Sequence, residues 1–244
     1  MGVLWLVQLV RRKGNLVEIG WAIGLGLLAV FYATYGDGGY GPRKLLIAIL
    51  GAVAALRLTY HLLRYCVLNT EEEDRHLMLR EKWGANAQRN FFIFFQVQGF
   101  FVVILSLTFL VIVKNPVPGF ELNEMFGVML WTGAFIGQTI ADSQLAEFRS
   151  TPENQSKVCK AGLWRYSRHP NYFFEWLMWV AYGAIAVSAP YGGIGFLIAL
   201  FMLFLILKVV GIPPNERSAL AVTPTEYAEY QRTTSKFVPW FCKE

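Results

Sequence analysis

The sequence predicts an all-α fold, a polytopic transmembrane helical bundle, from its composition, its repeated apolar runs and the distribution of its positive charge. Of the 244 residues, 55% are hydrophobic and only 16% are charged, whereas soluble domains usually carry about 25% charged residues. Apolar runs recur from one end of the chain to the other without a polar domain between them. We therefore expect residues 1–244 to form a single integral membrane domain.

Six segments have the roughly 20 mostly apolar residues that a membrane-spanning helix needs. They are residues 17–35, 45–67, 92–113, 123–141, 171–189 and 193–211. The first ten residues are also apolar, but this run is only half a span long and basic residues follow it, which is the reverse of a secretory signal peptide. We therefore expect a shortened N-terminal helix followed by six full spans.

The positive charge indicates how these spans are oriented. Of the 22 Lys and Arg residues, sixteen lie in segments 11–16, 68–91, 142–170 and 212–244, which six alternating spans would place on one side. The opposite loops hold only Arg43, Lys44 and Lys114. By the positive-inside tendency the sixteen mark the cytosol, so we expect a multi-pass protein with a cytosolic C-terminus. The basic residues form no continuous face, so nucleic acid is not an expected partner.

The three cysteines and the histidines do not indicate a metal site or a disulfide framework. Cys66, Cys159 and Cys242 have no metal-like spacing, and their odd number in charged loops predicts reduced thiols without a catalytic role. His169 has no second ligand at metal spacing. Because it precedes Pro170, we expect His169 to cap the fifth full span.

Polar residues gather where two of the expected spans meet the cytosol. Gln138 and Asp142 are four residues apart, as are Asn171 and Glu175, so each pair shares one helical face. Polar groups at this depth are costly and usually face a cavity. The cations Arg149, Lys157, Arg165 and Arg168 follow within 20 residues of one another and could hold a diphosphate; an ordinary positive-inside loop is the alternative for these cations alone.

Two runs in this region carry a resemblance to a known family. They are Ala-Asp-Ser-Gln-Leu-Ala-Glu-Phe-Arg at 141–149 and Lys-Val-Cys-Lys-Ala-Gly-Leu-Trp-Arg-Tyr-Ser-Arg-His-Pro-Asn-Tyr-Phe-Phe-Glu at 157–175. Together with Gly-Ile-Pro-Pro-Asn-Glu-Arg at 211–217 and the segment 227–240, they resemble the C-terminal domain of the steroid 5α-reductase family, in its bacterial uncharacterised branch. The Arg-His-Pro-Asn-Tyr core is shared with sterol reductases, and isoprenylcysteine carboxyl methyltransferases have a shorter version.

The resemblance implies a cofactor-binding half at residues 131–240 that binds NADPH without a Rossmann fold. The positions that it assigns to this cofactor are Gln138, Asp142, Arg149, Lys157, Arg168, His169, Asn171, Tyr172, Glu175, Tyr230 and Arg232. Two of them depart from the steroid enzymes, which have Asn at position 138 and Arg at position 157. Because Lys cannot make the bidentate phosphate contact of Arg, the choice between NADPH and NADH stays open.

The implied reaction is hydride transfer to a lipophilic enone, such as a 3-oxo-Δ4 steroid, and it needs an acid near the carbonyl oxygen. Glu18 resembles the catalytic glutamate of the steroid enzymes, although a carboxylate that snorkels to the interface is an equal alternative. The family's partner tyrosine has no clear counterpart, and Tyr60 is the expected substitute. Arg57, inside an apolar run, needs a partner such as Glu18 or a phosphate, and Arg57 and Gln98 are the expected substrate-binding residues.

Two alternatives to a reductase stay open. One is a membrane carboxyl methyltransferase that uses S-adenosylmethionine on a lipidic substrate; the Asp142 and Asn171 pattern favours reduction over this reading. The other is a non-catalytic membrane protein that binds lipid, which the missing tyrosine and short N-terminus keep open. In every case the expected partners are a lipophilic small molecule and membrane lipid, and the sequence does not indicate an oligomeric state.

Overall fold

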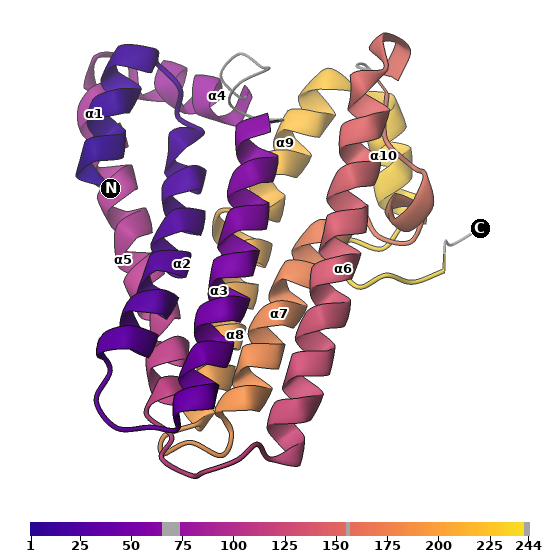
Figure 1. The fold of residues 1–244 in the computed structure, drawn as a ribbon. Helices are drawn as coiled ribbons and strands as arrows, with labels where there is room; N and C mark the ends of the chain where they lie inside the picture. The colour runs from indigo at the N-terminus through magenta and orange to yellow at the C-terminus, as the bar shows by residue number, and fades with distance from the viewer. Residues whose placement is uncertain (65–73, 155–156, 242–244) are drawn as a thin grey trace. The chain divides into compact units, whose positions relative to one another are not determined.

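The computed structural model describes residues 1–64, 74–154 and 157–241, and throughout this part of the chain the regular elements are helices (Figure 1). The long and medium helices are α1 (Gly2–Arg11), α2 (Leu16–Tyr35), α3 (Gly41–Leu62), α4 (Asp74–Trp83), α5 (Ala87–Val113), α6 (Leu122–Ser150), α7 (Pro170–Ala186), α8 (Gly193–Phe204), α9 (Ile212–Val222) and α10 (Pro224–Thr233). A π-helix (Leu205–Val209) continues α8, and short 3₁₀ turns lie at Gly84–Asn86, Pro152–Asn154 and Gly162–Arg165. The all-α prediction is therefore confirmed.

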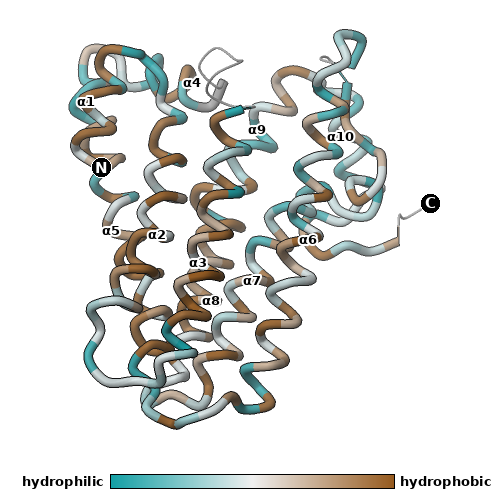
Figure 2. Tube along the Cα trace, in the orientation of Figure 1, coloured by the Kyte–Doolittle hydropathy of each residue, from teal (hydrophilic) through white to brown (hydrophobic). Residues whose placement is uncertain are grey.

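Within the described ranges 1–64, 74–154 and 157–241, four helical stretches are long and apolar enough to cross a membrane. They are Leu16–Tyr35, Gly41–Leu62, His76–Val113 and Gly193–Val222, and Figure 2 shows hydrophobic residues along α2, α3, α5 and α8. The expected spans 123–141 and 171–189 coincide with α6 and α7, but these helices do not meet the same criterion. The physical reason is that α6 carries acidic and amide side chains and α7 has only 17 residues. The short N-terminal apolar helix is present as α1.

The chain forms two compact units. Unit 1 comprises Met1–Glu121 and Ala186–Gly195, and unit 2 comprises Leu122–Ile185 and Phe196–Glu244. These units describe how contacts cluster within the chain and do not test whether residues 1–244 form one domain, so the single-domain prediction stays a prediction. Unit 2 holds all eleven residues that the family resemblance assigns to the cofactor, whereas Glu18, Arg57, Tyr60 and Gln98 lie in unit 1.

Small residues bring α2 and α3 of unit 1 into close contact. A Cβ added to Gly26 would lie 2.5 Å from the Cβ of Ala55, and one added to Gly51 would lie 2.4 Å from the Cβ of Ala29. Small residues at such an interface let two backbones approach closely, which is the common way for helices to pack in a membrane. The two contacts define an antiparallel register in which Glu18 lies level with Leu62, the last residue of α3, and with Leu63 after it.

The basic residues in one of the loops expected on the opposite side have structural partners in unit 1. Arg43 is fully buried and donates to the carbonyls of Asn115, Val117 and Gly119 at 2.8–3.0 Å. Lys44 donates to the carbonyl of Gly36. These two cations therefore tie loops together at one end of the helices.

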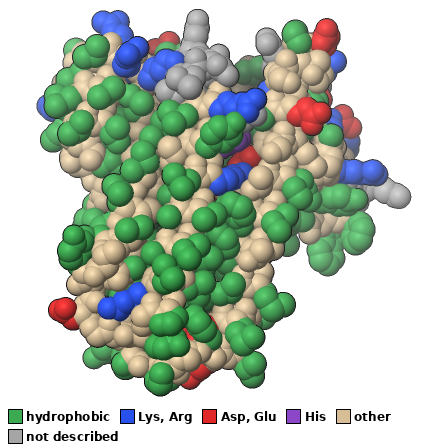
Figure 3. All heavy atoms as spheres, in the orientation of Figure 1, with side chains coloured by type: hydrophobic (Ala, Val, Ile, Leu, Met, Phe, Trp, Pro, Cys, Tyr) green, Lys and Arg blue, Asp and Glu red, His purple; other side chains and the backbone are tan. Residues whose placement is uncertain are grey.

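Exposed apolar side chains cover the flanks of the helices, as expected of a surface that contacts lipid. Leu27, Leu45 and Leu56 in unit 1 are 64%, 61% and 71% exposed, and in unit 2 Leu197 is 64% exposed. Figure 3 shows such side chains along the helices, with several Lys and Arg side chains near the end of unit 1 where α1 and α4 lie. A water-soluble surface would leave far fewer large apolar side chains exposed.

Candidate functional site

The centre of the candidate site is a pair of hydrogen bonds that join α6 to α7. Gln138 Nε2 donates to Glu175 Oε2 at 2.7 Å, and Asn171 Nδ2 donates to Asp142 Oδ1 at 2.9 Å. Both pairs follow one antiparallel register, one helical turn apart. The expectation that each i, i+4 pair shares a helical face is therefore confirmed, and the two faces meet. We call these four residues the polar ladder.

Local packing explains why the two faces meet so closely. Gly137 lies against the ring of Phe174, and a Cβ at this position would come within 2.5 Å of that ring. At the far end of the same helix pair, Gly127 packs on the backbone of Ala181. Glycines on α6 thus let α7 approach within reach of short amide and carboxylate side chains.

The ladder is held away from solvent on the α6 side. Gln138 and Asp142 are 6% and 5% exposed. Glu175 accepts a second bond, from Trp179 Nε1 to its Oε1 at 3.1 Å. Because buried polar groups need partners, these bonds stabilise the ladder in one arrangement of donors and acceptors.

A second polar cluster lies just before α7 and joins it to α9. Glu216 Oε1 accepts from Arg168 Nε at 2.9 Å and Nη2 at 2.8 Å, and His169 Nε2 lies 3.4 Å from the same oxygen. Arg168 Nη1 also donates to the carbonyls of Gln231 and Thr234, at 2.9 and 2.8 Å. We call Arg168, His169 and Glu216 the buried junction. It ties the start of α7 to α9 and to the end of α10.

His169 is almost fully buried in this junction, and burial lowers the pKa of its imidazole, which the hydrogen bond to Glu216 only partly offsets. The neutral ring is therefore favoured, with Nε2 as the donor to Glu216. The carbonyl of His169 accepts from the amide of Phe173 at 3.1 Å, which confirms that His169 caps the first turn of α7. Its ring stacks on Tyr172, with 5.8 Å between the centroids.

The helical stretch that begins with α8 is interrupted before α9, and this interruption places α9 beside the start of α7. The π-helix Leu205–Val209 is followed by Val210 and then by Gly211, where a Cβ would lie 2.7 Å from the carbonyl oxygen of Ile206. Such π-helical insertions often mark functional regions. The turn that follows places Asn215 so that its Nδ2 donates to the hydroxyl of Tyr172 at 2.7 Å.

The loop before α7 is fixed to α6 and α10 by buried hydrogen bonds. Trp164 Nε1 donates to the carbonyl of Ala141 at 2.9 Å, and the hydroxyl of Tyr230 donates to the carbonyls of Trp164 and Ser167. Gly162 has a φ of +58° and lies against Gln144, so a side chain is excluded here. These hydrogen bonds therefore attach the loop to both helices within unit 2.

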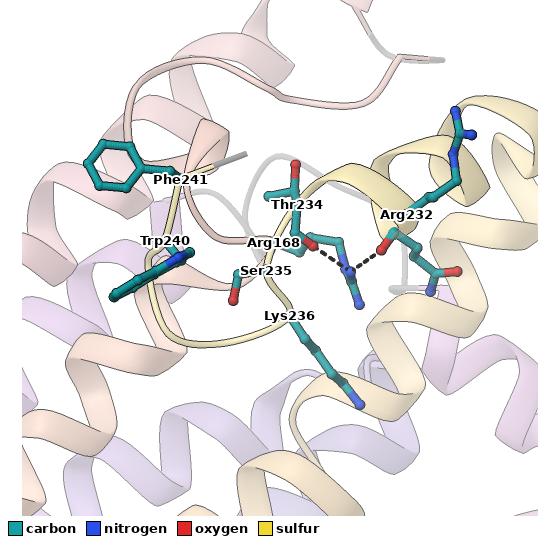
Figure 4. A pocket seen from close by; sticks show the side chains of 8 residues that line it. Arg168, Arg232, Thr234, Ser235, Lys236, Trp240 and Phe241 are labelled. Carbon is teal, nitrogen blue, oxygen red and sulfur yellow. Dashed lines mark hydrogen bonds between the residues drawn. The ribbon is translucent and has the colours of Figure 1, made fainter. Parts of the chain in front are cut away.

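A pocket of about 370 Å³ lies beside the junction, between the end of α10 and the segment that follows it. Its lining is Arg168, Gln231, Arg232, Thr234, Ser235, Lys236, Trp240 and Phe241. Figure 4 shows Arg168 bonded to the backbone at its centre, with the Arg232 and Lys236 side chains extending in opposite directions. The pocket thus combines cationic and aromatic side chains, and the predicted cofactor residues Arg168 and Arg232 both line it.

Five of the predicted cofactor residues fall into an exposed group and a buried group. Arg149 and Lys157 are exposed, as is Arg232, which pairs with Glu229 at 3.6 Å. Exposed cations such as these fit the phosphates of a dinucleotide. Arg168 and Tyr230 are buried and already bonded to the protein, so their geometry fits a structural role better than direct contact with a phosphate.

The predicted catalytic and substrate residues have separate environments in unit 1. Glu18 is half-buried in the first turn of α2, where a carboxylate stabilises the helix dipole. Tyr60 is 58% exposed, and its hydroxyl accepts from Arg64 Nη1 at 2.6 Å. Arg57 is half-buried, and Gln98 is 7% exposed, with no partner for its Oε1 among the described residues.

Sequence reasoning missed three residues of this arrangement: Glu216, Asn215 and Trp179. The signal for the first two was present, because they lie in the run 211–217 that carries part of the family resemblance, directly after two prolines. Trp179 follows Glu175 by four residues, which is the spacing of side chains on one helical face.

Comparison with known proteins places the chain in a family. The family described as "Protein of unknown function (DUF1295)" matches residues 4–234. An uncharacterised protein of Schizosaccharomyces pombe is 27% identical over 213 residues, which is 75% of this chain and 61% of that protein. The chain thus spans about three fifths of this relative's length. No solved structure matches. Because the family match covers nearly the whole chain, the protein belongs to the DUF1295 family.

Proposed function

We propose that the protein is a membrane-embedded, NAD(P)H-dependent reductase of a lipophilic enone, such as a 3-oxo-Δ4 steroid or a related lipid. The observation that carries this proposal is the polar ladder, because Gln138, Asp142, Asn171 and Glu175 are residues that the steroid 5α-reductase resemblance assigns to the cofactor. Ionisable and amide side chains inside a helical membrane bundle are costly, so two amides and two carboxylates within one helical turn of each other favour a functional site.

The proposal includes a topology of six spans with a cytosolic C-terminus. Among the residues that the structure describes, four stretches meet the criterion of length and hydropathy, and α6 and α7 coincide with the two other expected spans. Six spans would place the polar ladder and the buried junction near the cytosolic surface, where a water-soluble dinucleotide can reach them. The excess of Lys and Arg in the loops on that side supports the orientation.

The residues of unit 2 fit a dinucleotide in part. Arg149 and Lys157 would hold its phosphates, and the ladder would exchange some of its internal hydrogen bonds for bonds to the polar edge of the cofactor. When bound, the cofactor would supply the hydride for the β carbon of the enone. Glu18 is the proposed acid that donates a hydrogen bond to the carbonyl oxygen, with Tyr60 as the substitute.

The test is a titration of the purified full-length protein with NADPH, NADH and S-adenosylmethionine, using the variant Asn171→Leu. This change removes the donor to Asp142, and loss of a bond of this type should weaken nucleotide binding by about tenfold or more. The matched control is Asn123→Leu, since Asn123 Nδ2 donates to the carbonyl of Ala184 at 3.0 Å at the other end of the same helix pair.

Both variants should lose similar thermal stability, but only Asn171→Leu should lose affinity for the nucleotide. Consumption of NADPH in the presence of a 3-oxo-Δ4 steroid then tests the substrate class. Binding of S-adenosylmethionine in place of NADPH and NADH would replace the proposal with a methyltransferase. If none of the three binds, the polar ladder is a packing feature and the enzyme proposal is wrong.

A further inference from the structure

The segment Ser235–Phe241, which we call the C-terminal strap, follows α10 and is held firmly against the rest of unit 2. The carbonyl of Ser235 accepts from the amide of Arg168 at 2.8 Å, and the carbonyl of Phe237 accepts from the hydroxyl of Ser167 at 2.8 Å. The amide of Trp240 donates to the carbonyl of Tyr166 at 2.9 Å. These three bonds give the strap one fixed inner face and one fixed outer face.

The inner face of the strap packs on the start of α7. Phe237 is 9% exposed, and its ring lies 5.6 Å from that of Phe173 and 5.8 Å from that of Trp176. Both partners belong to the first two turns of α7, which begins at Pro170. At a rise of 1.5 Å per residue, they lie within about 10 Å of the end of the helix. The strap therefore lies at the level where α7 would enter the membrane.

The outer face of the strap is apolar and aromatic. Val238, Trp240 and Phe241 are 50%, 68% and 77% exposed, and Tyr166 beside them is 39% exposed. Phe241 contacts the rings of both Tyr166 and Trp240, at 6.4 and 6.3 Å. Such a cluster is unfavourable in water. Trp and Tyr side chains are enriched where membrane meets water, because their rings are apolar and their polar atoms can stay hydrated.

Positive charge accompanies this aromatic face. Lys236 belongs to the strap and is exposed, and Arg232 lies one turn earlier at the end of α10. All four of Arg232, Lys236, Trp240 and Phe241 line the pocket, and Figure 4 shows the two aromatic rings on one side of it and the two cationic side chains on the other. A mixture of aromatic and basic side chains is complementary to a leaflet that contains anionic phospholipid.

We propose that the C-terminal strap is an interfacial membrane anchor, which inserts Trp240 and Phe241 among the headgroups beside α7 and places Lys236 against lipid phosphate. The occupant of the aromatic face is the anionic leaflet of the same membrane that the helices cross. This inference rests on the proposed spanning of α7 and is independent of the proposed reductase activity. It makes the attachment of the strap, and hence of the buried junction, sensitive to the composition of the bilayer.

The test measures the depth of a spin label at Val238→Cys in a full-length variant without other cysteines. The label leaves Trp240 and Phe241 intact. The protein is placed in nanodiscs of phosphatidylcholine with phosphatidylglycerol. The accessibility of the label to oxygen and to a water-soluble nickel complex should place it at the headgroup level. Replacing Trp240 and Phe241 by Ser should move it into water. Lys236→Gln should lower the ratio of immersed to water-exposed label about fivefold, and only when phosphatidylglycerol is present.

Two reference labels separate failure of the anchor from failure of the topology. Leu197→Cys, on α8 in an apolar stretch that meets the membrane criterion, should lie in hydrocarbon, and Glu229→Cys, whose side chain is 63% exposed on α10, should lie in water. If the Val238 label is in water while the Leu197 label is in hydrocarbon, the anchor is wrong. Shielding of the Val238 label from both reagents would indicate a protein partner and also overturn it. If the Leu197 label is in water, the membrane topology fails and the anchor fails with it.

Discussion

The buried junction makes a prediction whose size follows from the structure. The side chains of Arg168 and Glu216 are 8% and 13% exposed, and their nearest atoms are 2.8 Å apart. Arg168→Ala would leave the carboxylate of Glu216 without its cation. It would also leave the carbonyls of Gln231 and Thr234 without the donor Arg168 Nη1. Removing one partner of a buried ion pair typically costs about 3–5 kcal/mol. We expect a loss of this size, concentrated where Arg168 holds the end of α10.

Hydrogen exchange in detergent micelles measures this loss locally. The amide of Trp240, which is bonded to Tyr166, reports whether the C-terminal strap is attached. Its protection should fall by about two to nearly four orders of magnitude in Arg168→Ala. The matched control is Arg232→Ala, because Arg232 pairs with Glu229 at 3.6 Å with both side chains mostly exposed. An exposed pair contributes less than about 1 kcal/mol, so protection should change less than about fivefold.

A second variant separates loss of the pair from loss of packing. The double change Arg168→Met with Glu216→Leu replaces both charges by apolar side chains and should recover much of the lost protection, since no buried charge is left alone. If Arg168→Ala and Arg232→Ala have equal small effects, the buried junction does not hold the strap. A failure of the double variant to recover would show that the bonds to the two carbonyls, rather than the ion pair, carry the stability.

Three further predictions concern packing, protonation and reactivity. Gly51→Leu should destabilise the α2–α3 contact by about 1–3 kcal/mol through its clash with Ala29, seen as a lower melting temperature than for Gly133→Leu, where nothing lies within 4 Å of the added Cβ. Because burial lowers the pKa of His169, its contribution to stability is complete above about pH 6.5 and is lost as the pH falls from there towards the folded-state pKa. In thermal melts, the melting temperature should fall less between neutral and acid pH in His169→Asn than in the parent protein. An equal fall in both proteins would assign this pH dependence to other groups. Cys159 is buried with a raised thiol pKa, so in a variant with no other cysteine N-ethylmaleimide should modify it only after unfolding, and rapid labelling of the folded protein would contradict its burial.

The sequence by itself determined the class of the fold and the faces of the helices. Runs of about 20 apolar residues admit few structures other than helices in a membrane, because the backbone must satisfy its own hydrogen bonds there. The spacing of Gln138 and Asp142, and of Asn171 and Glu175, identified two polar faces, because residues four apart lie on the same side of an α-helix. The side chains that lower the hydropathy of α6 include Gln138 and Asp142 of the candidate site, and α7 is one turn shorter than a typical span, so a simple count of spans is weakest where the site lies.

Only the tertiary structure decided which polar groups are partners. The pairing of Gln138 with Glu175 and of Asn171 with Asp142 depends on the register of two antiparallel helices, which glycine packing sets and local spacing does not encode. The cation of Arg168 illustrates the difference. In the sequence it is one of several basic residues suited to a phosphate, whereas in the fold Glu216 and two backbone carbonyls surround it. These partners of Arg168 are 48, 63 and 66 residues away in the sequence, so only the path of the whole chain brings them together. A buried charge is stable only where the fold supplies its counter-charge and hydrogen-bond acceptors.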